Sequence, residues 1–249
     1  MPATGPDVRG LDVPGAPPTR LVFTCEHGGN QVPARYRPLF TGHEALLDSH
    51  RGYDPGALAL ARDLARAFEA PLVAATTSRL LVELNRSPHH PRLFSEVLRA
   101  ASPELRAELV ARYYLPYRTR TERLIAGAIL RGRQVIHISS HSFTPVLDTM
   151  ARNADIGLLY DPARPGERAL CLRWQAALAR HAPRRKVRRN YPYTGKSDGF
   201  CAWLRRRFGP ADYIGIELEI NQKFVLAGGR EWGALRRAVV AALADALGG

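Results

Sequence analysis

Short apolar runs bounded by polar turns alternate with longer amphipathic segments from Thr19 to the end of the chain. The short runs are typical of strands, and the longer segments have the residue spacing of helices. Strands that alternate with helices predict crossover units, which build a largely parallel sheet, so we expect an α/β fold. The predicted strands are residues 20–25, 72–75, 80–84, 134–140, 155–160, 186–189 and 213–220, and the predicted helices are residues 54–68, 102–130, 167–181, 198–208 and 231–247.

Residues 1–18 differ in composition from the rest of the chain. They contain five prolines and three glycines, a composition that does not repay the entropy cost of ordering. We predict a flexible tail over residues 1–18 and one folded domain over residues 19–249. No run approaches the roughly 18 apolar residues of a membrane span, and the first residues lack the apolar core of a signal peptide. We therefore expect a cytoplasmic protein that does not enter the membrane.

The chain is strongly basic, with 36 Lys and Arg against 23 Asp and Glu and a formal net charge of +13. This charge permits either a nucleic acid or a small anionic substrate as partner. Two arginine-rich runs, residues 184–189 and 205–207, would form the surface of a nucleic-acid-binding protein. No nucleic-acid-binding module accompanies them, so we disfavour nucleic acid. The three scattered cysteines, Cys25, Cys171 and Cys201, predict neither a disulfide framework nor a thiolate zinc site.

Two histidines follow predicted strands. His27 comes after residues 20–25, and His141 comes directly after residues 134–140. In open α/β sheets ligands bind beyond the carboxyl ends of the strands, so both side chains are placed for one shared site. Two neutral histidine nitrogens, with a carboxylate and a water, would complete an open Zn²⁺ site. We interpret His137, which lies inside its strand, as a core residue.

The predicted strand of residues 213–220 carries two carboxylates on one face. Period-two alternation places its isoleucines and Leu218 on one face and Glu217 and Glu219 on the other. Because a strand covered on both faces is normally apolar throughout, the two glutamates need a partner such as a metal, an arginine or a substrate. An exposed sheet face or a buried Glu–Arg pair is the alternative, which the residue pattern alone favours.

A predicted strand that ends in Asn85 and Arg86, with Arg79 at its other end, offers an amide and a guanidinium fork at its tip. Such a pair is suited to a bidentate grip on a carboxylate. A surface arginine and a turn-forming asparagine would explain the same residues equally well. Asp54 stands before Pro55 at the start of a predicted helix, where we expect it to be the N-cap.

Six short motifs, taken in order, resemble those of the N-formylglutamate amidohydrolases over about residues 20–240. Each motif is a weak signal alone, but six in the same order are specific. The motifs are Glu26-His27-Gly28-Gly29-Asn30; Asp54-Pro55-Gly56-Ala57; Ser78-Arg79 leading to Leu84-Asn85-Arg86; Ser140-His141-Ser142-Phe143-Thr144-Pro145; Tyr193-Thr194-Gly195 with Asp198-Gly199; and Glu217-Leu218-Glu219-Ile220-Asn221-Gln222.

That family in turn resembles the zinc carboxypeptidase fold. The resemblance implies a single three-layer domain with a central mixed, mostly parallel sheet and helices on both faces. It also implies that His27 and His141 are metal ligands and that Glu217 is the general base. The same resemblance implies a substrate-binding role for Asn85 and Arg86, to which we add Arg79.

One position departs from the carboxypeptidase pattern, in which a ligand glutamate stands three residues after the first histidine. Here that residue is Asn30, which is a poor Zn²⁺ ligand. The third ligand must then come from elsewhere. We prefer Asp54, and Glu26, Asn30 and Glu219 are the alternatives.

The resemblance implies a hydrolase that uses a divalent metal, Zn²⁺, to cleave the linear amide of N-formyl-L-glutamate to L-glutamate and formate. A small anionic substrate suits a basic chain, because a positive cleft raises the local substrate concentration. One alternative is a related hydrolase of another N-acyl amino acid or of a small peptide. The other is an inactive, basic nucleic-acid-binding protein on the same fold.

Overall fold

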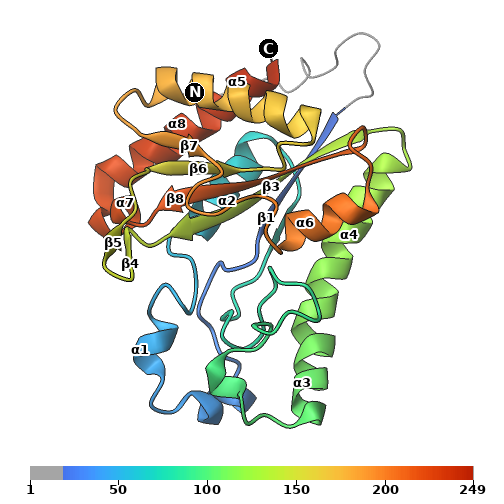
Figure 1. The fold of residues 1–249 in the computed structure, drawn as a ribbon, viewed down its shortest axis with the longest axis vertical. Helices are drawn as coiled ribbons and strands as arrows, with labels where there is room; N and C mark the ends of the chain where they lie inside the picture. The colour runs from blue at the N-terminus through green and yellow to red at the C-terminus, as the bar shows by residue number, and fades with distance from the viewer. Residues whose placement is uncertain (1–18, 249) are drawn as a thin grey trace.

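The computed structural model describes residues 19–248, whose strands form a six-stranded sheet and a separate two-stranded hairpin. The sheet has the order β2-β1-β3-β8-β6-β7 (Figure 1). Neighbours from β2 to β8 are parallel, β6 is antiparallel to β8, and β7 is parallel to β6. The expected mixed, mostly parallel sheet is confirmed. Its strands are β1 (Thr19–Cys25), β2 (Leu72–Ala74), β3 (Gln134–Phe143), β6 (Ile156–Leu159), β7 (Val187–Arg189) and β8 (Tyr213–Asn221).

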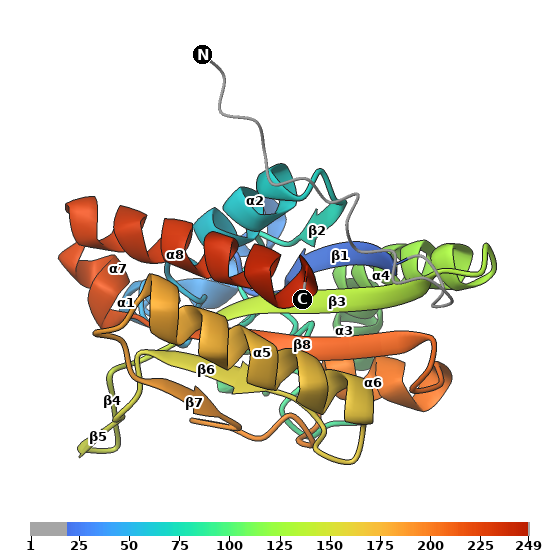
Figure 2. The ribbon, with the colours of Figure 1, turned by 90° about the horizontal axis from the view of Figure 1, so that it is seen from above.

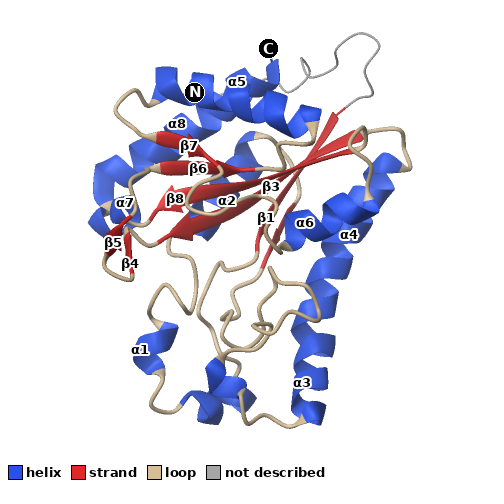
Figure 3. Cartoon of the chain, in the orientation of Figure 1, coloured by secondary structure: helices blue, strands red, loops and turns tan. Residues whose placement is uncertain are grey.

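Helices cover both faces of the sheet, as expected (Figure 3). One face packs against α2 (Ala57–Ala67), α5 (Pro165–His181) and α8 (Gly229–Gly248), and Figure 2 shows α5 and α8 running alongside each other. The other face packs against α4 (Leu115–Ile129) and α6 (Phe200–Arg207). No helix of residues 19–248 is both long enough and apolar enough to cross a membrane.

The polar residues of the central strands share one face of the sheet. In β8 the isoleucines and Leu218 pack in the core beneath α5 and α8, so Glu217 and Glu219 lie on the opposite face. The parallel register places Ser139 beside Glu217 and His141 beside Glu219. Towards the carboxyl ends of these strands the sheet therefore carries a row of buried polar groups where an apolar core would be expected.

Beyond the carboxyl ends of β1 and β3, the chain builds a smaller apolar cluster from the segments on either side of β2, drawn below the sheet in Figure 1. These segments are the 3₁₀ turns η2 (Ala34–Phe40) and η3 (Glu96–Leu98) and the helices α1 (Glu44–Leu47) and α3 (Pro103–Leu109). A π-helical turn, η4 (Val110–Tyr114), joins α3 to α4. The long predicted helix of residues 102–130 is thus confirmed in extent, and Ser102 caps it by accepting a hydrogen bond from the amide of Leu105.

Two local predictions are wrong. Residues 80–84 form no strand. Leu80 and Leu81 are buried in the smaller apolar cluster, whereas Val82 and Leu84 are buried against α4 and α6. These apolar side chains are therefore buried without strand pairing. Asp54 is not a helix cap. Helix α2 begins at Ala57 after Gly56, whose φ of 81° places it in the left-handed region that glycine tolerates.

Several short elements were not predicted, and the longest strand is longer than expected. Strand β3 continues to Phe143, so His141 lies within the strand. The unpredicted elements besides those around the smaller cluster are β4 (Val146–Leu147), β5 (Met150–Ala151) and α7 (Lys223–Ala227). The predicted tail of residues 1–18 lies outside the described residues.

A buried ion pair ties α5, α6 and β8 together. Arg205 of α6 donates through Nε to Glu167 of α5 at 2.8 Å, and its Nη2 donates to the carbonyl of Gly215 in β8 at 2.7 Å. The Glu167 carboxylate also accepts the amides of Asp161 and Gly215. Both charges are therefore buried with hydrogen-bond partners, which is the condition under which a buried ion pair is tolerated.

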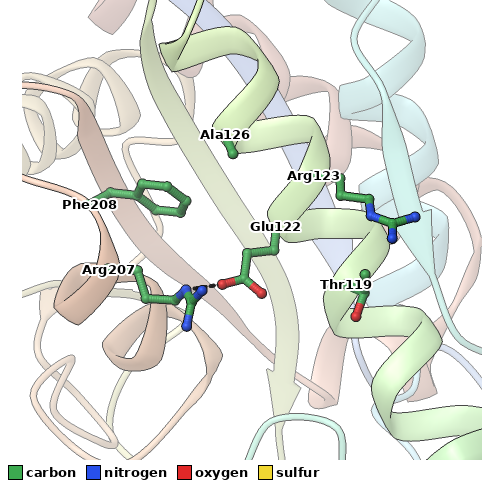
Figure 4. Close-up of a pocket in the computed structure, with 6 residues that line it drawn as sticks. All are labelled: Thr119, Glu122, Arg123, Ala126, Arg207 and Phe208. Carbon is green, nitrogen blue, oxygen red and sulfur yellow. Dashed lines mark ion pairs between the residues drawn. The ribbon is translucent and has the colours of Figure 1, made fainter.

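We predict that Arg205→Leu lowers the free energy of unfolding by about 3–5 kcal/mol, because it leaves the Glu167 carboxylate buried without its counter-charge. Arg207→Leu on the same helix is the control. Arg207 pairs with Glu122 of α4 at a shallow surface pocket (Figure 4), and about half of its side chain is exposed. An exposed pair contributes at most about 1 kcal/mol. Urea unfolding of the two variants measures both values, and equal losses would contradict the role given to Arg205.

Candidate active site

Three predicted metal-binding side chains meet at the carboxyl ends of β1 and β3. His27 follows β1, His141 lies in β3, and Asp54 precedes α2, yet one ligand atom from each lies within 4.8 Å of the other two. Oδ2 of Asp54 is 3.3 Å from Nδ1 of His27 and 2.9 Å from Nδ1 of His141. All three side chains are buried. We call these residues the His–Asp–His cluster.

Buried carboxylates hold the other ring nitrogen of each histidine. Nε2 of His27 lies 2.5 Å from Oε1 of Glu83, and Nε2 of His141 lies 3.2 Å from Oε2 of Glu26. Ser139 donates to Glu26, and its Oγ is 2.8 Å from Nε2 of His141. A carboxylate on the far nitrogen fixes the orientation of a histidine ring, and this arrangement is typical of histidines that bind metal ions.

Arg79 belongs to the same network. Its Nη1 donates to Oδ1 of Asp54 at 3.1 Å, and its Nη2 lies 2.6 Å from Oε2 of Glu83. The guanidinium therefore connects a member of the His–Asp–His cluster to the carboxylate that orients His27. Both carboxylate oxygens of Asp54 have partners, so its position is closely defined.

The electrostatics of the cluster favour ionised carboxylates. Burial alone would raise the pKa of Asp54, but the charge of His27 and the hydrogen bonds from both histidines hold that pKa well below its usual range. Burial lowers the pKa of His141, whereas its bonds to Asp54 and Glu26 outweigh that effect and raise the pKa well above its usual value. A cation that binds here would displace the histidine protons and meet an ionised carboxylate.

The His–Asp–His cluster opens into a cavity of about 700 Å³, which is also lined by Asn85, Arg86 and Glu217. The backbone amide of Phe200 donates to Oδ1 of Asn85, and Arg86 donates to the carbonyl of Asp198. Gly199 lies between Asn85 and Glu217. A Cβ at this glycine would be 3.3 Å from the Asn85 amide oxygen and 3.4 Å from a carboxylate oxygen of Glu217. The cavity thus brings together the predicted base and the predicted Asn–Arg pair.

The two glutamates of β8 differ in their access to the cavity. Glu217 lines it, and burial raises the pKa of this carboxyl above its usual value. Glu219 does not line it. Burial raises the pKa of Glu219 to about 8, and its Oε2 has no hydrogen-bond partner among residues 19–248. A carboxyl with such a pKa is largely protonated at neutral pH.

The remaining candidates for third ligand lie elsewhere. Asn30 is partly exposed, donates to Oδ1 of Asp48 at 2.8 Å and lines a separate pocket. Glu26 contacts His141 on the side away from Asp54 and accepts a hydrogen bond from Tyr117. His137 is a satisfied core residue, as interpreted from the sequence, with Thr24 and Tyr213 as partners.

Sequence reasoning missed Glu83 and His90 as parts of this region. The sequence predicts a strand over residues 80–84, and that pattern does not indicate that Glu83 orients His27. The spacing of four residues between Arg79 and Glu83 suits an ion pair. His90 is half-buried at the cavity wall. Its neighbourhood is an irregular loop, and irregular loops have no periodicity from which a side chain's direction can be inferred.

Comparisons with known proteins identify the family and the fold of this chain. The family model of N-formylglutamate amidohydrolase matches residues 19–226. A crystal structure of a gene product from Agrobacterium tumefaciens is similar with a TM-score of 0.78 and 30% identity, covering 91% of this chain and 90% of that chain. The N-formylglutamate amidohydrolase from Ralstonia eutropha has a TM-score of 0.65 and 21% identity, with 92% of each chain covered.

A search of curated proteins found no match to this chain. The family match is nevertheless broad, since it extends from β1 to α7 and includes every residue of the His–Asp–His cluster together with Glu217 and Arg86. On this evidence the chain belongs to the N-formylglutamate amidohydrolase family.

Proposed function

We propose that this protein is a metal-dependent amidohydrolase that cleaves N-formyl-L-glutamate to L-glutamate and formate. The observation that carries the proposal is the His–Asp–His cluster, in which a buried carboxylate orients each histidine at the wall of a cavity that also holds Glu217 and Arg86. The related structure from Ralstonia eutropha is named an N-formylglutamate amidohydrolase, which supports the choice of substrate.

The cluster suits a divalent metal, with Zn²⁺ as our choice. Two histidine nitrogens and one carboxylate oxygen are the protein ligands of many catalytic zinc sites, and a three-ligand set leaves a position open. When bound, the metal would polarise the amide carbonyl and lower the pKa of water towards 7.

Glu217 is proposed as the general base and then the general acid. Its carboxylate would accept a proton from the attacking water and return a proton to the nitrogen of the leaving amine. Burial raises the pKa of Glu217, which makes the carboxylate a better proton acceptor. The reaction consumes one water, breaks the carbon–nitrogen bond of the amide and releases formate.

Arg86 and Asn85 are proposed to orient the substrate through one of its carboxylates. Arg86 uses Nη1 on the Asp198 carbonyl and forms no ion pair within the described part of the chain. The sequence predicts that Arg79 binds substrate as well. Since its guanidinium pairs with Asp54 and Glu83, we propose instead that it positions the cluster.

The alternative as a nucleic-acid-binding protein gains no support from the arginine-rich runs. Arg205 is buried on Glu167, Arg207 pairs with Glu122, and Arg185 pairs with Glu231. These ion pairs occupy three of the eight basic side chains in the two runs, and the buried Arg205 is not available to phosphates. An amidohydrolase screen over N-formyl and N-acetyl amino acids would separate N-formylglutamate from the other N-acyl substrates.

We predict that Glu217→Gln binds metal but turns over N-formylglutamate about 10²–10⁴-fold more slowly, the usual cost of losing a general base. Glu219→Gln is the matched control on the same strand face. Glu219 lies outside the cavity, so an amide of the same shape should leave turnover near normal. Steady-state kinetics with metal analysis would give both results. A slow Glu219→Gln beside a normal Glu217→Gln would reverse the assignment.

We also predict about one divalent metal per chain, which is lost together with activity in the double variant His27→Ala, His141→Ala. Glu83→Gln should keep both ligands but weaken metal binding by about 10–100-fold, because it removes the carboxylate that orients His27. Elemental analysis and competition with a chelator measure the two effects. If the double variant retains its metal, the site is elsewhere.

A further inference from the structure

The cavity beside the His–Asp–His cluster holds more positive charge than the proposed mechanism uses. Five arginines among the described residues line it. Arg79 pairs with Asp54 and Glu83, and Arg51 pairs with Glu96. The other three, Arg86, Arg92 and Arg152, form no ion pair within residues 19–248, and of these Arg92 is exposed whereas Arg86 and Arg152 are half-buried.

Arg152 is held in place by neighbouring aromatic side chains. It follows β5, and its backbone amide donates to the carbonyl of Pro145 at 2.8 Å, which fastens the β4–β5 hairpin. Its guanidinium carbon is 5.0 Å from the ring centre of Tyr193 and 5.8 Å from that of Phe143, and Nη2 donates to the Tyr193 hydroxyl at 3.0 Å. The guanidinium is thus oriented before any ligand binds.

One nitrogen of this oriented group has no partner. Nη1 of Arg152 is buried and makes no hydrogen bond to any residue of the described chain. A buried donor on a charged group is costly when it is unpaired, and an anion in the cavity would supply both the acceptor and the counter-charge. A carboxylate matches the fork of a guanidinium especially well.

We propose that Arg152 binds the side-chain carboxylate of the substrate and so selects acidic N-acyl amino acids over neutral ones. This inference rests on the proposed function. The α-carboxylate is attached one carbon from the amide nitrogen, so its partner lies near the base. Arg86 fits that position. It donates to the carbonyl of Asp198, and the next residue, Gly199, lies against Glu217. Arg152 is then the half-buried, unpaired cation left for the second carboxylate.

The test compares N-formyl-L-glutamate with N-formyl-L-glutamine, in which a neutral carboxamide of the same shape replaces the side-chain carboxylate. Wild-type protein should prefer the glutamate substrate by about 10²-fold or more in kcat/KM, since a site built for a charged partner rejects the analogue without it. In Arg152→Ala this ratio should fall to within about threefold of one. Arg152→Lys, which keeps the charge without the fork, should restore part of the preference.

Two variants serve as controls on the same cavity. Arg86→Ala should lower kcat/KM for both substrates by a similar factor, because both carry the α-carboxylate. Arg92→Ala should keep the wild-type ratio, since Arg92 is exposed at the rim. A wild-type ratio in Arg152→Ala would overturn the assignment of Arg152 while leaving the proposed function intact.

If wild-type protein hydrolyses neither substrate, the proposed function fails, and Arg152 is tested by calorimetric binding of glutarate and butyrate. Glutarate, with two carboxylates, should bind the metal-loaded wild-type protein at least about tenfold more tightly than butyrate, a gain in the range of one charge-assisted hydrogen-bonded contact. Arg152→Ala should make the two affinities similar. Equal affinities in the wild-type protein would overturn the inference.

Discussion

The shared carboxylate of Asp54 is the interaction on which the site depends. Its Oδ2 faces Nδ1 of both His27 and His141, and its Oδ1 accepts from Arg79. These contacts fasten the loop after β1, the segment before α2 and the end of β3 to one another. A charge buried so deeply is tolerated only with several partners, so the surrounding chain has to supply them.

Those partners explain why the polar face of the sheet can be buried. Glu26 and Glu83 hold the outer nitrogens of the two histidines, while Ser139 and Tyr117 donate to Glu26. The irregular course of residues 80–84 follows from the same need. It brings Glu83 to His27 and leads Asn85 and Arg86 into the cavity. Leu80, Leu81 and Leu84 are still buried.

The sequence predicts the regular strands and helices of this molecule, because their apolar residues recur with the period of a strand or a helix. Alternation in residues 213–220 places Glu217 and Glu219 on the polar face. The strand ends predicted at residues 25 and 140 place His27 and His141 in one shared site, although β3 continues to Phe143. Asp54 required the family resemblance, since its local pattern is that of a helix cap. Glu83 and Arg152 could not be found, because they lie in a loop and beside a short hairpin, and the directions of their side chains are set by distant contacts.

The central claim is that His27, Asp54 and His141 bind one catalytic metal ion. Anomalous X-ray diffraction at the zinc edge, from crystals of the active, zinc-loaded protein, tests it most directly. We predict one strong peak about 2.0–2.2 Å from Nδ1 of each histidine and from Oδ2 of Asp54, the usual zinc distances to nitrogen and oxygen ligands. An active crystal with no peak among these three side chains would contradict the account.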